Sequence, residues 1–122
     1  AAVINWYGIS DVNDVLEGIN AKHYTIEWFG SLPNREELAR QLSPLTHVAA
    51  GAPAVLTIHG DADKVVPYTQ AQRLHAALDK AGVPNRLVTV SGGGHGGFSR
   101  QDLLGCYAAI REFLRKNGIV QE

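Results

Sequence analysis

Several features that mark whole classes of protein are missing from this 122-residue chain. There is no run of basic residues, and the formal charge is only -1 at pH 7, so binding to nucleic acid or to a membrane surface has no electrostatic support. No apolar segment approaches the roughly 20 residues that a membrane-spanning helix needs. The single cysteine, Cys106, excludes an internal disulfide and leaves the redox compartment undecided. No Cys/His spacing of the zinc-binding kind is present.

The N-terminus lacks both a starting methionine and a signal-like segment. The chain opens directly on residues 1–6, which read as a strand. A parallel strand in this position needs neighbours on both sides. We therefore expect residues 1–122 to be the C-terminal portion of a single, longer α/β domain, although their number is itself enough for a hydrophobic core.

The most informative stretch runs from Pro53 to Pro67. Residues 54–58 are a short apolar run with β-branched side chains, which is typical of a strand buried on both faces of a parallel sheet. The run ends in a polar loop that holds Asp61 and Asp63, and Pro67 is predicted to open the next helix. Both carboxylates therefore follow the carboxyl end of a strand, where open α/β sheets place their functional groups.

A second strand–loop–helix unit follows the first. Residues 86–90 form the predicted strand, and a loop at 91–97 places His95 among five glycines. One helix separates the two strands, so we expect them to be parallel and joined by a right-handed crossover. Neighbouring strands lie about 4.8 Å apart. An acid and an imidazole should then project from the same edge of the sheet, close enough to pair.

The remaining segments alternate between helices and connectors. A cap at residues 10–11 should begin a short helix that Gly18 ends. Residues 19–32 have no clean period, so we expect an irregular insertion that covers the core as a lid and, in a sharper interpretation, contacts substrate. A capping-box pattern at residues 34–37 predicts a helix that ends just before Pro44.

Each longer helix has a predicted buried face. Leu38 and Leu42 share one face of the helix that precedes Pro44, and residues 68–81 form an amphipathic helix. The last helix, residues 101–117, begins with a capping box at Ser99. Its predicted buried stripe consists of Leu103, Tyr107, Ile110 and Leu114. The order of strands and helices predicts an α/β fold rather than an α+β fold.

The two loops suggest nucleophilic catalysis. His95 would take the proton of a serine hydroxyl, and an aspartate would hold its imidazole in the correct tautomer. Asp63 and Asp61 compete for the role of that acid, and the residues alone do not separate them. The competing interpretation is that loop residues lie near one another only because of topology. The glycines argue against it, since they strip other side chains from around His95.

Other chemistries have weaker support. His59, Asp61 and Asp63 are potential metal ligands at alternating positions, but a site usually needs a supporting second shell. The loop at 92–97 matches a dinucleotide pattern that is weak on its own. Ser10 follows Gly8-Ile9 but lacks the second glycine of a nucleophile elbow, so a capping role is preferred. Cys106 is interpreted as a packing residue.

Several motifs together carry a family resemblance. They are Ser43-Pro44-Leu45, Pro53, His59-Gly60-x-x-Asp63-x-x-Val66-Pro67 and Gly94-His95-Gly96, with Asn5-Trp6-Tyr7-Gly8 and Ser10-Asp11 near the start. Over nearly the whole chain they resemble the C-terminal half of an α/β-hydrolase. The resemblance is strongest to bacterial esterases of the prolyl-oligopeptidase-like type, among them acetylxylan and feruloyl esterases.

The resemblance implies the roles of several residues. It assigns the catalytic acid to Asp63 and the base to His95, in the triad order Ser…Asp…His and with no cofactor. It also implies that Val65 and Val66 lie near the acyl or leaving-group pocket. The family's G-x-S-x-G elbow and oxyanion-hole loop have no counterpart in these 122 residues. The resemblance leans toward a secreted or periplasmic enzyme, although the sequence names no compartment.

These inferences define an expected function. The chain should be part of a serine esterase that acts on a small-molecule or carbohydrate-linked ester, and the missing N-terminal part of the fold should supply the serine. Alone, it should be inactive. A serine peptidase of the same family is the first alternative. The second is a non-catalytic scaffold or binding domain, which a loop collapsed over His95 would favour, whereas an intact Asp63–His95 hydrogen bond in an open cleft would favour the enzyme.

Overall fold

A three-stranded parallel sheet is the centre of the computed structural model, which describes residues 1–121. The strands are β1 (Ala2–Trp6), β2 (Ala54–Gly60) and β3 (Asn85–Val90), and they lie in that order across the sheet. In the register, Ile4 lies opposite Leu56. All of β2 except one residue is buried, as expected for a strand covered on both faces. The structure confirms the predicted α/β class with parallel strands.

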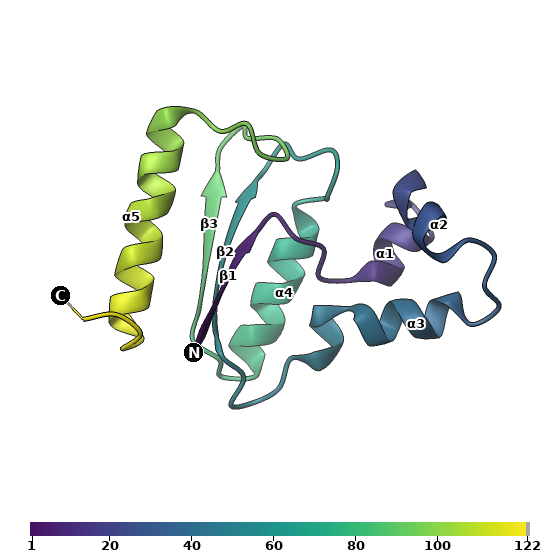
Figure 1. The fold of residues 1–122 in the computed structure, drawn as a ribbon, viewed down its shortest axis with the longest axis horizontal. Helices are drawn as coiled ribbons and strands as arrows, with labels where there is room; N and C mark the ends of the chain where they lie inside the picture. The colour runs from purple at the N-terminus through teal and green to yellow at the C-terminus, as the bar shows by residue number, and fades with distance from the viewer. Residues whose placement is uncertain (122) are drawn as a thin grey trace.

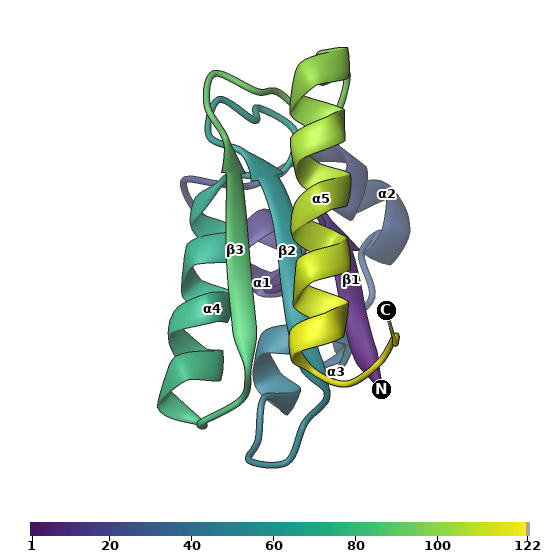
Figure 2. The ribbon, with the colours of Figure 1, turned by 90° about the vertical axis from the view of Figure 1, so that its left-hand side faces the viewer.

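Helices cover both faces of this sheet (Figures 1 and 2). In Figure 1, α5 lies on one side and α4 on the other, while three short helices form a lobe beyond α4. The helices are α1 (Val12–Leu16), α2 (His23–Phe29), α3 (Arg35–Leu42), α4 (Thr69–Lys80) and α5 (Arg100–Lys116), with a 3-10 turn at Pro44–His47. The loops that follow β2 and β3 meet at one edge of the sheet (Figure 1). This arrangement places Asp63 and His95 at the same edge.

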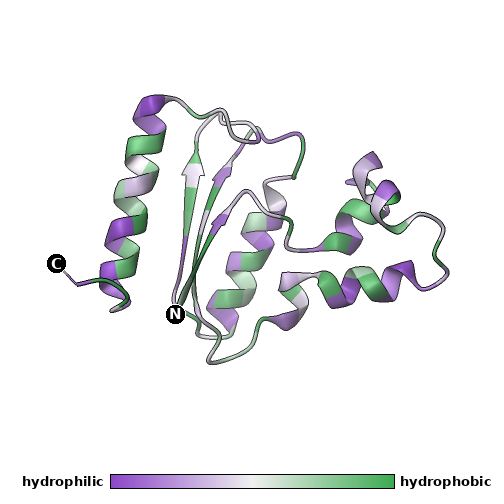
Figure 3. Ribbon diagram, in the orientation of Figure 1, coloured by the Kyte–Doolittle hydropathy of each residue, from purple (hydrophilic) through white to green (hydrophobic). Residues whose placement is uncertain are grey.

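Two apolar clusters hold the layers together. On the α5 side, Leu56 and Ile58 of β2 pack with Cys106 and Phe113. The cluster on the α4 side includes Leu78 and neighbouring residues of α4. Burying one such side chain completely stabilises the fold by roughly 1.5–3 kcal/mol. In Figure 3 the longer helices carry bands of both polar and apolar residues, which is typical of helices with one buried face.

The helical lobe differs from the sequence expectation in two ways. Residues 19–32 are not irregular throughout, because they contain α2. The seven residues of α2 are too few for a clear period, and its anchor is tertiary, since the buried Phe29 packs into the α1–α3 cluster. The predicted capping box at α3 is wrong: Asn34 makes no side-chain capping hydrogen bond. Ala39 is the buried residue of α3, whereas Leu42 is exposed.

The longer helices match the prediction more closely. Ser99 caps α5, as expected. Pro67, predicted to open α4, lies in the turn just before it. The predicted stripe of α5 is displaced around the helix, because Ala109 is buried whereas Tyr107 is 55% exposed. The reason is that α5 rests mainly on β2 and β3, whereas the ring of Tyr107 lies 5.9 Å from that of Trp6 at the end of β1 and is only partly covered.

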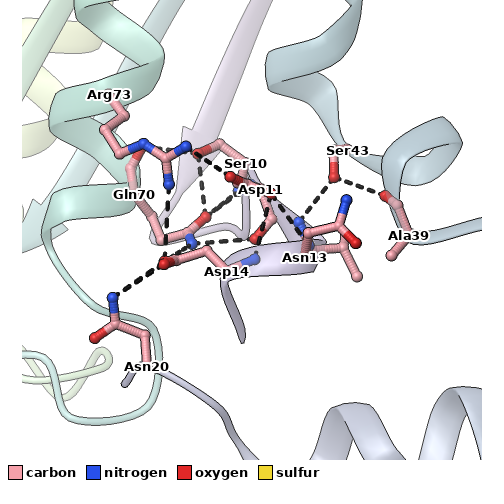
Figure 4. A network of polar contacts seen from close by, with 10 residues as sticks. Ser10, Asp11, Asn13, Asp14, Asn20, Ala39, Ser43, Gln70 and Arg73 are labelled. Atoms are coloured by element: carbon pink, nitrogen blue, oxygen red, sulfur yellow. Dashed lines mark hydrogen bonds and ion pairs between the residues drawn. The ribbon is translucent and has the colours of Figure 1, made fainter. Parts of the chain in front are cut away.

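A buried polar network ties α1 to α4 (Figure 4). Gln70 is fully buried, and its side-chain oxygen accepts hydrogen bonds from the backbone N–H groups of Ser10 and Asp11 at 2.9 and 2.7 Å. The Ser10 hydroxyl donates to the Gln70 carbonyl at 2.7 Å. The capping role predicted for Ser10 is therefore wrong, and Asp11 caps α1 by accepting from the N–H groups of Asn13 and Asp14. A buried hydroxyl with these partners is also unavailable as a nucleophile.

The outer side of β1 is an open edge within residues 1–121, because β1 pairs only with β2. Val3 on this strand is 46% exposed. Beside it lies an apolar cavity of about 300 Å³ whose lining includes Val3, Val48 and Leu74. None of the helices in the described residues combines the length and apolar character that a bilayer crossing requires. An open strand edge and an exposed apolar surface both favour association with other chains.

We predict that the 122-residue chain, produced alone, associates with itself or with a partner. Pairing at β1 and cover over the apolar cavity would remove unsatisfied backbone groups and apolar surface from water. Light scattering at increasing concentration should show a mass above the 13.1 kDa of one chain. Val3→Lys, which places a charge on the edge strand, should reduce that association. A monomer at high concentration would contradict the prediction.

Candidate active site

Close backbone contact brings the two loops together at the carboxyl edge of the sheet. A Cβ atom on Gly60 would collide with the backbone carbonyl of Gly93, so only glycine fits at the end of β2. The N–H of Ala62 donates to the Gly93 carbonyl at 3.0 Å. Asp61 Oδ1 accepts from the N–H of Gly92 at 2.6 Å. The first loop therefore fixes the path of the second.

Asp63 and His95 meet across this junction. His95 Nδ1 lies 2.9 Å from Asp63 Oδ2, and because a carboxylate can only accept, Nδ1 carries the hydrogen. The other oxygen, Oδ1, accepts from the backbone N–H groups of Val65 and Val66 at 2.8 and 2.9 Å. His59 Nε2 lies 3.3 Å from Oδ2. The carboxylate is thus hydrogen-bonded by groups from both loops, and His59 at the end of β2 lies beside it.

The electrostatics of Asp63 favour its charged form. Burial by itself would raise the pKa of this carboxyl, but the hydrogen bonds from His95, Val66 and Val65 outweigh it. The net result is a pKa below the usual value for aspartate. The Asp63 side chain is fully buried, whereas that of His95 is 32% exposed. His95 is therefore bonded to a buried carboxylate while about a third of its own side chain is exposed.

The three candidate metal ligands do not converge. His59 is fully buried, and its Nε2 lies 2.9 Å from the carbonyl of Val66, which it holds in the acid loop. Asp61 turns instead toward Gly92, and Asp63 turns toward His95. No group of three or more His, Cys, Asp or Glu side chains in residues 1–121 is placed to hold a metal ion. The two aspartates, indistinguishable in the sequence, have separate tasks in the structure.

The α2 segment reaches the loop that carries Asp63. The Tyr24 hydroxyl donates to the carbonyl of Val65 at 3.0 Å, and Lys22 Nζ donates to the carbonyl of Lys64 at 3.0 Å. Burial, followed by the charge of Asp63, raises the pKa of Tyr24. Val65 is 43% exposed, whereas Val66 is 3% exposed. Of the two valines expected near the substrate, only Val65 is therefore exposed, whereas Val66 is buried.

One aromatic residue at this edge was not among the predicted site residues. The ring of Tyr7, directly after β1, lies 4.6 Å from that of His95, measured between centroids. A tyrosine after a strand carries no recognisable signal by itself, since the contact depends on the loop geometry. Cys106 is buried, as expected for packing, and burial together with the charge of Asp102 raises the pKa of its thiol.

Comparison with known proteins places this edge in a family. The sequence profile of the BD-FAE family matches residues 1–78 of the 122. The chain belongs to the BD-FAE family. The match includes the loop of Asp63 but ends before His95. The structural neighbours are α/β-hydrolases, chiefly esterases, as the family resemblance implied.

Three solved structures illustrate this likeness. A truncated carbohydrate esterase from gut microbiota is 31% identical, with a TM-score of 0.73 over 92% of this chain. Esterase 2 of Thermogutta terrifontis, solved with butyrate bound, is 26% identical, with a TM-score of 0.75 over 98% of this chain. A puromycin-hydrolysing peptidase of Mycobacterium tuberculosis is 33% identical, with a TM-score of 0.67 over 78% of this chain.

The chain spans less than half of each of these proteins. It covers 42% of the gut carbohydrate esterase, 44% of the Thermogutta esterase and 15% of the peptidase. It also covers 34% of the length of two uncharacterized M. tuberculosis proteins to which it is 34% identical. The likeness therefore establishes the fold and the esterase family for a segment, and the activity of the whole protein is a separate question.

We predict that Gly60→Ala destabilises the chain. The new methyl group would collide with the Gly93 backbone, and overpacking of this kind costs about 1–3 kcal/mol. Urea unfolding at fixed protein concentration should show a lower midpoint. Gly94→Ala is the matched control, because a Cβ there meets no atom within 4 Å. Equal midpoints for Gly60→Ala and Gly94→Ala would contradict the close approach of the loops.

We also predict a pH-dependent role for the Asp63 carboxylate in stability. Its pKa is lower in the folded chain, so the charged group stabilises the fold above the unfolded pKa of about 3.9, and this contribution is lost as the pH falls through the folded value. Asp63→Asn should therefore have a lower urea midpoint than wild type at pH 7. The difference between the two midpoints should narrow below about pH 4. The matched control is Glu36→Gln at an exposed carboxylate. A gap that stays constant with pH would contradict this account.

Proposed function

We propose that this chain is the acid–base portion of a serine esterase, with Asp63 as the catalytic acid and His95 as the base. The observation that carries the proposal is the 2.9 Å hydrogen bond from His95 Nδ1 to Asp63 Oδ2. It joins a buried carboxylate, whose pKa is lowered, to an imidazole that is one-third exposed. This is the arrangement that a proton shuttle needs, since one ring nitrogen is anchored on the carboxylate and the imidazole remains partly exposed.

The chemistry follows from the two ring nitrogens. His95 Nε2 takes the proton as a serine oxygen attacks the ester carbonyl, and the imidazolium then gives that proton to the departing alcohol. Water then attacks the acyl-enzyme while His95 again takes the proton, which releases the carboxylic acid product and regenerates the serine. Throughout, Asp63 remains a carboxylate that holds Nδ1–H and stabilises the imidazolium. The cycle requires no cofactor.

The serine must come from outside residues 1–122. These residues contain no G-x-S-x-G sequence, and Ser10 is buried in its bonds to Gln70. In the proposed enzyme, the rest of the hydrolase fold lies against the open edge of β1 and supplies both the nucleophile and the oxyanion hole. Without that part the chain binds no reacting carbonyl and is inactive, so residues 1–122 are one portion of a single hydrolase domain.

The proposed substrate is a carboxylic ester, free or attached to a carbohydrate. The names of the neighbouring structures support this class, since one is a carbohydrate esterase and another binds butyrate. Val65, exposed beside the acid, is proposed to contact the acyl or leaving group, while the buried Val66 shapes the loop from behind. The insertion at residues 19–32 would extend this wall, because α2 is hydrogen-bonded to the same loop.

A serine peptidase is the second candidate, favoured by one observation. The puromycin-hydrolysing peptidase shares 33% identity, although this chain covers only 15% of it. Both activities would use the same Asp63–His95 pair. The partial exposure of His95 and its intact hydrogen bond argue against the third candidate, a non-catalytic scaffold. Hydrolysis of p-nitrophenyl acetate and feruloyl esters, compared with that of amide substrates, separates the first two.

We predict that the protein containing these residues, as purified from its source, takes up one fluorophosphonate on a serine outside residues 1–122. Intact-mass measurement followed by peptide mapping would locate the adduct. Asp63→Asn and His95→Ala should slow labelling by about four powers of ten, the usual cost of losing a triad member. Asp61→Asn, which alters only the hydrogen bond with the N–H of Gly92, should slow labelling far less. Unchanged labelling of His95→Ala, or an adduct on Ser10, would overturn the proposal.

A further inference from the structure

Tyr7 has an unusual backbone conformation at the edge of the proposed active site. Its φ is 42°, and it is the only non-glycine residue with a positive φ among residues 1–121. A side chain as large as tyrosine rarely adopts this region, because its Cβ crowds the backbone. Such strain persists only where the surrounding structure enforces it, and it is concentrated at functional sites.

The surroundings of Tyr7 account for how this conformation is held. Its backbone N–H donates to the carbonyl of Ile58 at 2.8 Å, which extends the β1–β2 ladder by one residue. The ring meets Phe98 nearly edge-on, with centroids 5.9 Å apart and planes at 77°. It also meets the Trp6 ring, with centroids 6.3 Å apart and planes at 71°. The turn at Tyr7 therefore directs the ring away from the sheet and toward the glycine-rich loop.

The ring ends against His95 and its neighbour. The centroids of the two rings are 4.6 Å apart, with planes at 58°. A Cβ on Gly96 would lie 3.2 Å from the Tyr7 hydroxyl oxygen, so this part of the loop passes directly over the tyrosine. Of all the ring pairs in the described residues, this is the closest.

His95 needs such a contact because its own loop restrains it poorly. Glycines surround it in the sequence and offer no side chains to pack against the imidazole. The hydrogen bond to Asp63 fixes Nδ1 but leaves the ring able to pivot about that atom. A second contact away from Nδ1 is required to fix the direction of Nε2. The Tyr7 ring is the aromatic side chain in contact with the imidazole.

We propose that Tyr7 is a positioning residue, whose ring fixes the plane of the His95 imidazole so that Nε2 points toward the serine while Nδ1 stays on Asp63. The role rests on the function proposed above. In this account, the positive φ at Tyr7 is what allows the aromatic ring to reach His95. Tyr7 itself touches no substrate in this account, and it acts only through His95.

The test compares backbone-matched variants in the serine-bearing protein. Tyr7→Asn removes the ring but suits the positive φ, since asparagine tolerates it better than most residues. We expect kcat for p-nitrophenyl acetate to fall about 100-fold with KM changed by less than about threefold, because misorientation affects the chemical step. Tyr7→Phe, which keeps the ring, should recover most of the lost rate. Tyr107→Asn removes a tyrosine that contacts Trp6, and it is the matched control.

A second readout does not depend on catalysis. In NMR spectra of the labelled 122-residue chain or its serine-bearing form, the rings of Tyr7 and His95 should give cross-peaks, and the Nδ1–H resonance of His95 should be resolved. Tyr7→Asn should broaden that resonance through faster exchange, whereas Tyr107→Asn should leave it in place. Wild-type spectra without the ring cross-peaks overturn the inference even if a variant fails to fold.

The outcomes separate this inference from the proposed function. If wild type forms no fluorophosphonate adduct but Tyr7→Asn still broadens the Nδ1–H resonance, the esterase assignment fails and the positioning contact stands. If wild type is labelled and Tyr7→Asn keeps both kcat and the resonance, the inference fails and the esterase assignment stands. A loss in Tyr7→Phe as large as that in Tyr7→Asn would also overturn it, because the ring would then not be the cause.

Discussion

The buried carboxylate of Asp63 is the interaction on which the candidate site depends. Removing a carboxylate from water is costly unless its oxygens are hydrogen-bonded, and hydrogen bonds to charged groups contribute roughly 1.5–3 kcal/mol each. Asp63 accepts two from its own loop and one from His95. The same bonds that keep the charge buried thus close the acid loop and hold the imidazole. They can form only because Gly60 lets the second loop approach so closely.

The part of this arrangement that follows from chain topology could be predicted from the sequence. Two strand–loop–helix units in succession imply parallel strands whose loops share an edge, which is where Asp63 and His95 lie. The residues did not separate Asp63 from Asp61, because both follow the strand within three positions. The structure distinguishes them by side-chain direction: Asp61 turns to the N–H of Gly92 and Asp63 to His95. That direction depends on how two distant loops meet.

Features that depend on long-range packing could not be read from local patterns. Ser10 is of a residue type that commonly caps helices, yet its hydrogen-bond partner is Gln70, 60 residues away. The buried face of α5 is set by the strands beneath it, so Tyr107 falls outside the core. Tyr7 lies in the Asn5-Trp6-Tyr7-Gly8 motif, but that motif gives it no role, and its importance appears only when its strained turn and its contact with His95 are seen together. In each case tertiary contacts override the local signal.

The Asp63–His95 pair lies at the edge of a sheet whose outer strand β1 pairs on one side only within residues 1–121. The open edge of β1 and the partly exposed His95 lie on a chain that spans less than half of its esterase neighbours. The most direct test of the central claim is a crystal structure of the protein after reaction with a fluorophosphonate. We predict His95 Nε2 within about 3 Å of the modified serine oxygen, with that serine outside residues 1–122 and Nδ1 still bonded to Asp63. A modified serine remote from His95 would contradict the account.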